Sequence, residues 1–471
     1  MTDPPEQVRR FLDHGRDSLL LGPDAPPGRY GRVALVVRDR LALRSLTVPE
    51  GVRAGAVAVF VENAAAPVTV VPPRAWPPLL RLRARPAAGG WLTVLRFEKY
   101  VDVGTVLAEL GRQAVHRSRG RGDGLDHRVL NPIGFDPAAA GPVVDAASLD
   151  LRDGATERLV AELRPAAGLR VATWDDATVR AVAGLAMAGI PVTAESAPAE
   201  GLGAEVAAAI TAPVDLDDVL AREEHSLVLR RAALDAHADL RLPAVSVVLA
   251  TRRPDMLEHA VGQVARQRGV DALELVLAPH GFEPDAAKVL DLLGPGVALR
   301  LCPQPESTLF GDVLDRAARE AGGDVILKMD DDDWYSPDVI ADLLRARAYS
   351  GAELVGMPAE FHYIEERDLT VRRGHASELY ATFVAGGTMM VDRSMLREVG
   401  GFRSVRKYVD AQLLAAVQAA GGAIYRTHGL GYLLRRTASG HTWQVDLDYL
   451  LDPERVAATY EGFRPSRLLE L

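Results

Sequence analysis

The feature that most constrains the fold is a regular alternation of apolar strands and amphipathic helices in the second half of the chain. Short apolar segments rich in β-branched residues predict strands, and the segments between them carry apolar residues at helical spacing. Strand, helix, strand, helix, strand, helix and strand are predicted, in that order, over Val245–Ala250, Pro254–Gln267, Leu273–Ala278, Asp285–Leu293, Val297–Leu301, Gly311–Ala321 and Val325–Met329. Such strands pair in parallel through right-handed crossovers. We therefore predict an α/β domain built on a mostly parallel sheet.

Four consecutive aspartates, Asp330–Asp333, follow directly after the last of these strands. Ligands of open parallel sheets bind beyond the carboxyl ends of the strands, so the acidic loop lies where a site is expected. Two carboxylates about 4 Å apart repel by roughly 4 kcal/mol at an effective dielectric near 20, so four of them need water or a cation. Acidic loops are often merely solvated, but this position favours a cation. If the loop is extended, its side chains alternate between two sides.

Five segments of this half carry a family resemblance: VSVVLATRRPDMLEHAVGQVARQ, VILKMDDDDWYSPDVIADLL, AGGTMMVDRSMLREVGGFR, VDAQLLAAVQAAGG and YLLRRTASGHTW. From about Val245 to Trp443 the chain resembles family 2 glycosyltransferases of the GT-A fold. In that family a DxD motif binds a divalent metal and the diphosphate of a nucleotide-sugar, a role that the resemblance assigns to Asp330, Asp332 and Asp333. It implies Mn²⁺ or Mg²⁺ as cofactor, with Asp330, Asp332 and His441 as the metal ligands.

The resemblance also assigns a catalytic base. The family places it in a Glu-Asp pair that opens a late helix, and here Asp410 matches the Asp while Val409 replaces the Glu. An acceptor hydroxyl must lose its proton as it attacks, which is the task of such a carboxylate. The alternative is that Asp410 only caps its helix.

Further residues are expected to bind the nucleotide-sugar: Thr251, Arg252, Gly386, Gly387 and Arg435. Turn chemistry alone is an alternative explanation for the glycine pair, and a structural role is one for His441. The chain departs from the family after the second strand, where Ala278–Gly281 replaces an acidic turn that helps to recognise the nucleotide base. His280 is a candidate substitute.

The resemblance implies a metal-dependent, inverting glycosyltransferase that moves a sugar from a nucleotide-sugar donor to a hydroxyl acceptor such as a glycan or polysaccharide. Two alternatives stay open. A nucleotidyltransferase uses a similar sheet, but normally has a glycine-rich basic loop after the first strand, where this chain has ATRRPDM. A catalytically inactive glycan-binding or scaffold protein is suggested by Val409 and by the altered turn.

Changes in pattern divide the 471 residues into three expected parts. Residues 1–125 are β-rich, residues 126–240 form an α/β segment that ends in a charged linker helix, and residues 241–471 form the GT-A domain with a C-terminal tail. A chain of this length usually folds as more than one domain. We expect residues 1–240 to be accessory, and acceptor recognition, oligomerisation and docking to an assembly are all open roles.

Charge and cysteine content limit the partners and the compartment. The net charge of -10 argues against a general nucleic-acid binder. The single cysteine, Cys302, cannot form an intramolecular disulfide, so a cytoplasmic location is expected. No signal peptide or membrane-spanning segment is evident, so we expect any membrane association to be peripheral.

Overall fold

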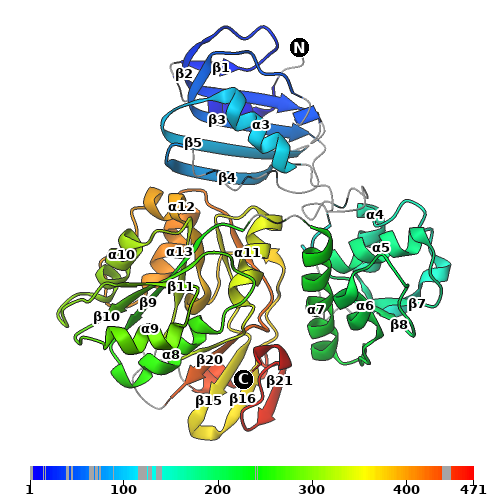
Figure 1. Cartoon of the computed structure of the whole chain (residues 1–471), viewed down its shortest axis with the longest axis vertical. Helices are drawn as coiled ribbons and strands as arrows, with labels where there is room; N and C mark the ends of the chain where they lie inside the picture. The colour runs from blue at the N-terminus through cyan, green and yellow to red at the C-terminus, as the bar shows by residue number, and fades with distance from the viewer. Residues whose placement is uncertain are drawn as a thin grey trace. The chain divides into compact units, whose positions relative to one another are not determined.

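The structure is a computed structural model that describes residues 4–470 except 14, 16, 39–41, 44–45, 63–67, 69, 71–72, 74–75, 88–89, 115–124, 126–129, 134–140, 239, 241 and 438–446. It divides into two compact units (Figure 1). Unit 1 comprises Met1–Arg241 with Ala348–Gly351, and unit 2 comprises Leu242–Arg347 with Ala352–Leu471. The three-part division expected from the sequence remains a prediction.

Unit 1 begins with a β-rich part. Its sheet has the order β1-β2-β3-β5-β4, with the first three strands parallel and the last two pairings antiparallel. One helix packs on each face, because Val8 joins a cluster with Phe60 while Leu107 joins one with Val57. The elements are α1 (Glu6–Asp13), β1 (Ser18–Leu20), β2 (Gly28–Val37), β3 (Val52–Glu62), β4 (Leu79–Ala87), β5 (Gly90–Asp102) and α3 (Val103–Ala114).

The second part of unit 1 is a small α/β layer, as the sequence pattern predicts. Three parallel strands, in the order β6-β7-β8, pack against buried helices whose apolar side chains form one core. The elements are β6 (Gly141–Asp145), α4 (Glu157–Leu163), β7 (Ala166–Val171), α5 (Asp176–Met187), β8 (Val192–Ala194), α6 (Ala204–Thr211) and α7 (Val219–His237).

Unit 2 is built on an eight-stranded sheet with the order β11-β10-β9-β12-β18-β14-β19-β17. Its first four strands are parallel, and β18 enters antiparallel to β12. These strands are β9 (Val245–Thr251), β10 (Leu273–Pro279), β11 (Val297–Leu301), β12 (Val325–Met329), β14 (Leu354–Gly356), β17 (Leu379–Tyr380), β18 (Met390–Asp392) and β19 (Ile424–Arg426). The predicted α/β fold with a mostly parallel sheet is confirmed.

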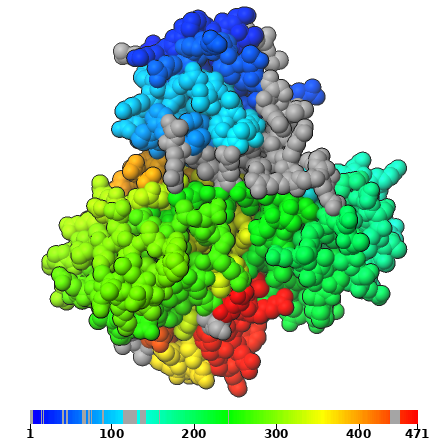
Figure 2. Space-filling view, in the orientation of Figure 1, coloured from blue at the N-terminus to red at the C-terminus, as the bar shows by residue number. Residues whose placement is uncertain are grey.

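The predicted crossover helices are present with small shifts. They are α8 (Leu257–Ala265), preceded by a 3₁₀ turn at Pro254–Met256, α9 (Ala286–Leu293) and α10 (Phe310–Glu320). Later helices are α11 (Val339–Ser350), α12 (Arg393–Glu398) and α13 (Val409–Ala419). All five residues of β12 are buried. Both faces of β12 are therefore covered by other parts of the chain. Figure 2 shows one face of the molecule with all side chains, coloured along the chain as in Figure 1.

A second sheet in unit 2 starts directly after the acidic loop. Its order is β13-β20-β15-β16-β21, and the strands are β13 (Trp334–Tyr335), β15 (Phe361–Ile364), β16 (Leu369–Arg372), β20 (Tyr432–Arg436) and β21 (Ala458–Glu461). The short helix α14 (Leu447–Leu450) packs its Leu450 against Ile364 and Val371 of this sheet. Within the described ranges, no helix is long and apolar enough to cross a membrane.

Candidate functional site

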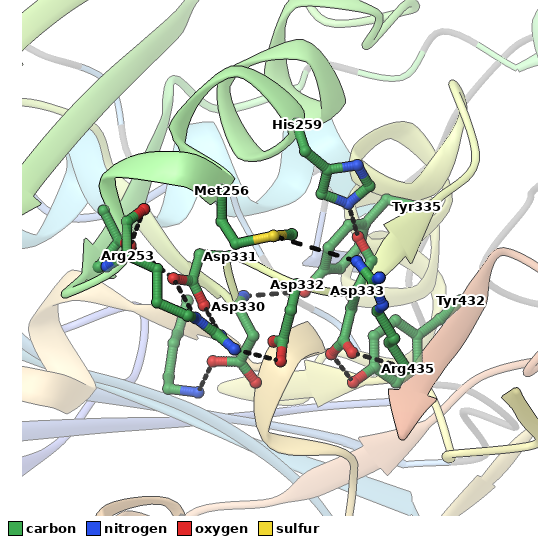
Figure 3. Close-up of polar contacts among 12 residues, drawn as sticks. Arg253, Met256, His259, Asp330, Asp331, Asp332, Asp333, Tyr335, Tyr432 and Arg435 are labelled. Atoms are coloured by element: carbon green, nitrogen blue, oxygen red, sulfur yellow. Dashed lines mark hydrogen bonds and ion pairs between the residues drawn. The ribbon is translucent and has the colours of Figure 1, made fainter. Parts of the chain in front are cut away.

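The acidic loop connects the two sheets of unit 2 at the carboxyl end of β12. Residues 331–333 form a bend between β12 and β13, so the loop is not extended. The condition under which its side chains would alternate between two sides is therefore not met. Asp331 and Asp332 share one partner, Arg253, whereas Asp333 turns toward β20 (Figure 3).

Arg253 and Thr251, at the end of the neighbouring strand β9, hold the first side of the loop. The guanidinium of Arg253 donates to both carboxylate oxygens of Asp331. Its Nη2 donates to Oδ1, and its Nε donates to Oδ2 at 3.1 Å. Its Nη1 donates to Oδ2 of Asp332 at 2.9 Å. Thr251 donates its hydroxyl to Oδ2 of Asp331 at 2.5 Å. The predicted residue Thr251 is thus in contact with the acidic loop, through the aspartate that the resemblance leaves without a role.

Asp333 anchors the other side of the loop to β20. Its Oδ1 accepts a hydrogen bond of 2.9 Å from the backbone N–H of Arg435, and its Oδ2 accepts one from the hydroxyl of Tyr432. Burial raises the pKa of Asp333 well above its ordinary value, and the charges of Asp332 and Asp330 add to the shift. Both oxygens of this predicted diphosphate-binding residue are therefore bound to protein donors.

Lys328 lies beneath Asp330 and reaches two functional candidates. Its Nζ is 2.6 Å from Oδ1 of Asp330 and 3.4 Å from Oδ1 of Asp410, and its side chain is only 3% exposed. Burial lowers the pKa of Lys328, but the two carboxylates outweigh this effect and raise the pKa above its ordinary value. The ammonium group therefore stays charged and links the acidic loop with the proposed base.

Asp410 lies in the first turn of α13, opposite the glycine pair. A Cβ atom at Gly386 would come within 2.1 Å of Oδ2 of Asp410, and one at Gly387 within 3.0 Å of Oδ2 of Asp330. Side chains at these positions would occupy the space around both carboxylates, so close approach explains the pair better than turn chemistry. Both glycines also have ordinary backbone angles, because neither is among the residues with positive φ.

Asp410 does not cap its helix, which was the alternative role for this residue. The N-cap of α13 is Tyr408, which makes no side-chain capping bond, and Oδ1 of Asp410 is buried without a hydrogen bond. Burial raises the pKa of Asp410, Lys328 opposes the shift, and Asp330 adds to it. The side chain of Asp410 is 38% exposed, and its Oδ1 has only the long contact of 3.4 Å with Lys328, so the carboxylate suits a proton acceptor.

Arg252, a predicted donor-binding residue, faces another group of residues. Its Nε donates to Nδ1 of His280 at 3.0 Å, and its Nη2 donates to the carbonyl oxygen of Glu306 at 2.9 Å. Burial lowers the pKa of His280, as does the charge of Arg252, so the imidazole is neutral. Arg252 and His280 thus form a pair at the ends of β9 and β10, where the departure from the family lies.

The last predicted ligands lie around β20. The guanidinium of Arg435 pairs with Glu365 at 2.6 Å and lies over the ring of Trp334, with 5.5 Å from its central carbon to the ring centroid. In this conformation Arg435 contacts the acidic loop through its backbone N–H, which donates to Asp333. The predicted metal ligand His441 lies outside the described residues.

The donor groups of the loop fit a divalent cation. Four carboxylates, those of Asp330, Asp331, Asp332 and Asp410, contact two side-chain cations, Lys328 and Arg253. Among the residues that the structure describes, no three histidine, cysteine or acidic side chains converge on one point. Mg²⁺ held by one or two carboxylates and by substrate phosphates needs no such group. Asp330, whose side chain is 34% exposed, and Asp332 are the residues that would hold the ion.

Three residues of the candidate site, Lys328, Arg253 and Tyr432, received no role from the sequence. Lys328 had a signal, because it is a charged residue in an otherwise apolar strand and lies two positions before Asp330, on the same side. Arg253 had a weaker one, since nothing in TRRPD tells which arginine turns toward the loop. Tyr432 becomes a partner of Asp333 only because β20 pairs with β13.

Comparison with known proteins gives one family match. Residues 246–414 match the family model described as glycosyl transferase family 2. No curated protein sequence matches the chain.

Solved structures with a likeness to the chain include two proteins in complex with nucleotide-sugars. One is the mannosyltransferase PcManGT from Pyrobaculum calidifontis in complex with GDP-Man and Mn²⁺, at 16% identity, with a TM-score of 0.35, over 42% of this chain and 59% of that one. Another is S. aureus TarS 1-349 in complex with UDP-GlcNAc, at 12% identity, with a TM-score of 0.33, over 44% of this chain and 63% of that one. The chain thus spans about three fifths of each of these structures.

The family match covers β9 to β12, the acidic loop, the glycine pair and Asp410, whereas β20 with Arg435 lies beyond it. Residues 246–414 of this chain are a glycosyl transferase family 2 domain.

Proposed function

We propose that unit 2 transfers a sugar from a nucleotide-sugar donor to a hydroxyl group of a glycan or other acceptor, with inversion and with a divalent cation. One observation supports this most strongly. Lys328 pairs with both Asp330 and Asp410, so the proposed diphosphate-binding carboxylate and the proposed base lie within reach of one ammonium group. Two parts of the reaction that must act together are therefore neighbours.

The reaction breaks the bond between the anomeric carbon of the sugar and a phosphate oxygen, while the acceptor oxygen bonds to that carbon from the opposite side. A dication held by Asp330 and Asp332 would supply positive charge to the departing diphosphate. Asp410 takes the proton of the acceptor hydroxyl. Lys328 keeps Asp410 close to Asp330, and Gly386 leaves room for the carboxylate of Asp410.

The proposal is tested by measuring release of nucleoside diphosphate from separate UDP-, GDP- and dTDP-sugars with Mn²⁺, with water or added glycans as acceptor. The unaltered chain should release nucleotide from at least one donor. Asp332→Asn and Asp410→Asn should each slow release by about a hundredfold or more, because each removes a charge that the transition state uses. Asp291→Asn, an exposed carboxylate of α9, is the matched control and should leave the rate unchanged.

The alternatives predict other results. A glycan-binding or scaffold protein releases no nucleotide from any donor. A nucleotidyltransferase instead consumes a nucleoside triphosphate and a sugar phosphate and forms pyrophosphate. Either result, or full activity of the Asp332 or Asp410 variant, contradicts the proposal.

A further inference from the structure

Arg253 is placed so that part of its guanidinium is fixed and part can change partners. Nε and Nη2 bind the two oxygens of Asp331, and Thr251 holds one of these oxygens as well. The remaining nitrogen, Nη1, reaches Oδ2 of Asp332 at 2.9 Å. The side chain of Arg253 is 33% exposed, whereas that of Asp331 is 9% exposed. Asp331 therefore acts as a buried anchor for an arginine whose outer edge faces the proposed metal ligand.

The bond between Arg253 and Asp332 occupies a carboxylate oxygen that a dication would use. A guanidinium and a divalent ion close to the same carboxylate also repel each other, since both are positive. Without a metal, the charge of Arg253 compensates the charges of Asp331 and Asp332. A dication bound to Asp332 would weaken the hydrogen bond between this carboxylate and Nη1 of Arg253. Only Nη1 changes its partner in this exchange, because Nε and Nη2 of the planar guanidinium stay bonded to Asp331.

A released Nη1 needs a new acceptor beside the dication. In the proposed reaction the groups next to the metal are the phosphate oxygens of the donor, and arginine N–H groups bind phosphate oxygens strongly. Arg252 is not in an equivalent position, because its guanidinium bonds to His280 and to the carbonyl of Glu306. Of the two neighbouring arginines, only Arg253 is therefore bonded to the acidic loop in a way that places Nη1 beside the proposed metal ligand.

We propose that Arg253 competes with the divalent cation for Asp332 and, once the cation is bound, holds the diphosphate of the donor through Nη1. This inference rests on the proposed function, and it assigns Asp331 the role of anchoring Arg253. It predicts two opposite changes from one substitution. Loss of the guanidinium should strengthen binding of the metal alone and weaken binding of the nucleotide.

The experiment compares the full-length chain with Arg253→Met and with the matched control Arg252→Met. Mn²⁺ affinity is measured without nucleotide by electron paramagnetic resonance of the free ion. UDP and GDP are then titrated separately at saturating Mn²⁺ by calorimetry. For Arg253→Met we expect Mn²⁺ affinity to rise about tenfold, because a competing charge is lost. Nucleotide affinity should fall about tenfold or more, because a charge-assisted hydrogen bond is lost. Arg252→Met should leave Mn²⁺ affinity unchanged.

Three results would overturn the inference. Unchanged Mn²⁺ affinity in Arg253→Met excludes competition, and unchanged nucleotide affinity excludes the bond to diphosphate. A fall of both affinities together shows that Arg253 only supports the shape of the loop. Failure of the proposed function gives a different result, namely no Mn²⁺ or nucleotide binding by the unaltered chain. Arg253→Lys, which keeps the charge but not the planar fork, should restore Mn²⁺ affinity to about the unaltered value.

Discussion

Glycine at position 386 is the clearest case of one residue deciding the geometry of the candidate site. The carboxylate of Asp410 fills the space that a Cβ atom at this position would take. The proposed base, Asp410, and the loop with the glycine pair can approach each other because Gly386 has no side chain. The family resemblance identified the glycine pair in the sequence. The reason why glycine is needed at position 386 is visible only in the structure, where Asp410 of α13 lies against it.

Gly386→Ala should move Asp410 and slow nucleotide release by about a hundredfold without unfolding the chain, because the obstructing atoms belong to a side chain that can turn away. Release rate and far-ultraviolet circular dichroism measure the two effects. Gly262→Ala in α8 is the matched control, since a Cβ there meets open space. It should keep full activity and stabilise the helix by about 0.5–1 kcal/mol. Equal activity of the two variants would contradict the role of this contact.

The candidate residues were predicted unevenly. Asp330, Asp332 and Asp410 lie together around Lys328 and Arg253, as a site requires. For Arg252 the sequence gives only that an arginine follows β9. Which of two adjacent arginines faces a loop 78 residues away depends on side-chain direction at the end of the strand, and on the bend at 331–333. Neither is encoded in a local pattern.

Among elements, the strands and helices with strong periodicity were predictable. The buried run VILKM and its neighbours VSVVLA and LELVLA each form the strand that their composition favours, in parallel register. The second sheet was not predictable. Strand β13 has two residues, and it pairs with β20, which lies about a hundred positions later in the chain. A long-range pairing of this kind leaves no periodic signal.

Strand β15 of the second sheet carries a buried histidine with a defined effect on stability. Burial lowers the pKa of His362 to about 3, and the charges of Arg373, His375 and Arg436 add to the shift. The unfolded chain has a histidine pKa near 6.5, so it binds the proton more readily than the folded chain does. Stability from this residue is therefore complete above pH 6.5 and is lost as the pH falls toward 3.

His362→Gln should remove this pH dependence, because glutamine does not ionise. Between pH 7 and pH 5 the unaltered chain should lose about 2 kcal/mol more local stability in β15 and β16 than the variant does. Hydrogen exchange of peptides from these strands, corrected for the intrinsic effect of pH, measures the difference. An equal loss in both proteins would show that His362 is not held neutral in the folded chain.

At the scale of the molecule, the family 2 match at residues 246–414 lies in unit 2 except for Ala348–Gly351, and most of unit 1 comes before it in the sequence. The change from β-rich to α/β pattern within residues 1–240 was visible in the sequence, and both kinds of sheet are present. The function of unit 1 could not be predicted from the sequence, because neither of its two parts carries a motif with a chemical meaning. Acceptor recognition, oligomerisation and docking to an assembly remain proposals for this unit.

The central claim is that a dication and a nucleoside diphosphate meet at the acidic loop of unit 2. A crystal structure of the full chain with Mn²⁺ and UDP or GDP, with manganese located by anomalous scattering, tests it most directly. We predict one manganese peak about 2 Å from carboxylate oxygens of Asp330 or Asp332 and from phosphate oxygens. A nucleotide bound elsewhere, or manganese that contacts neither aspartate, would contradict the account.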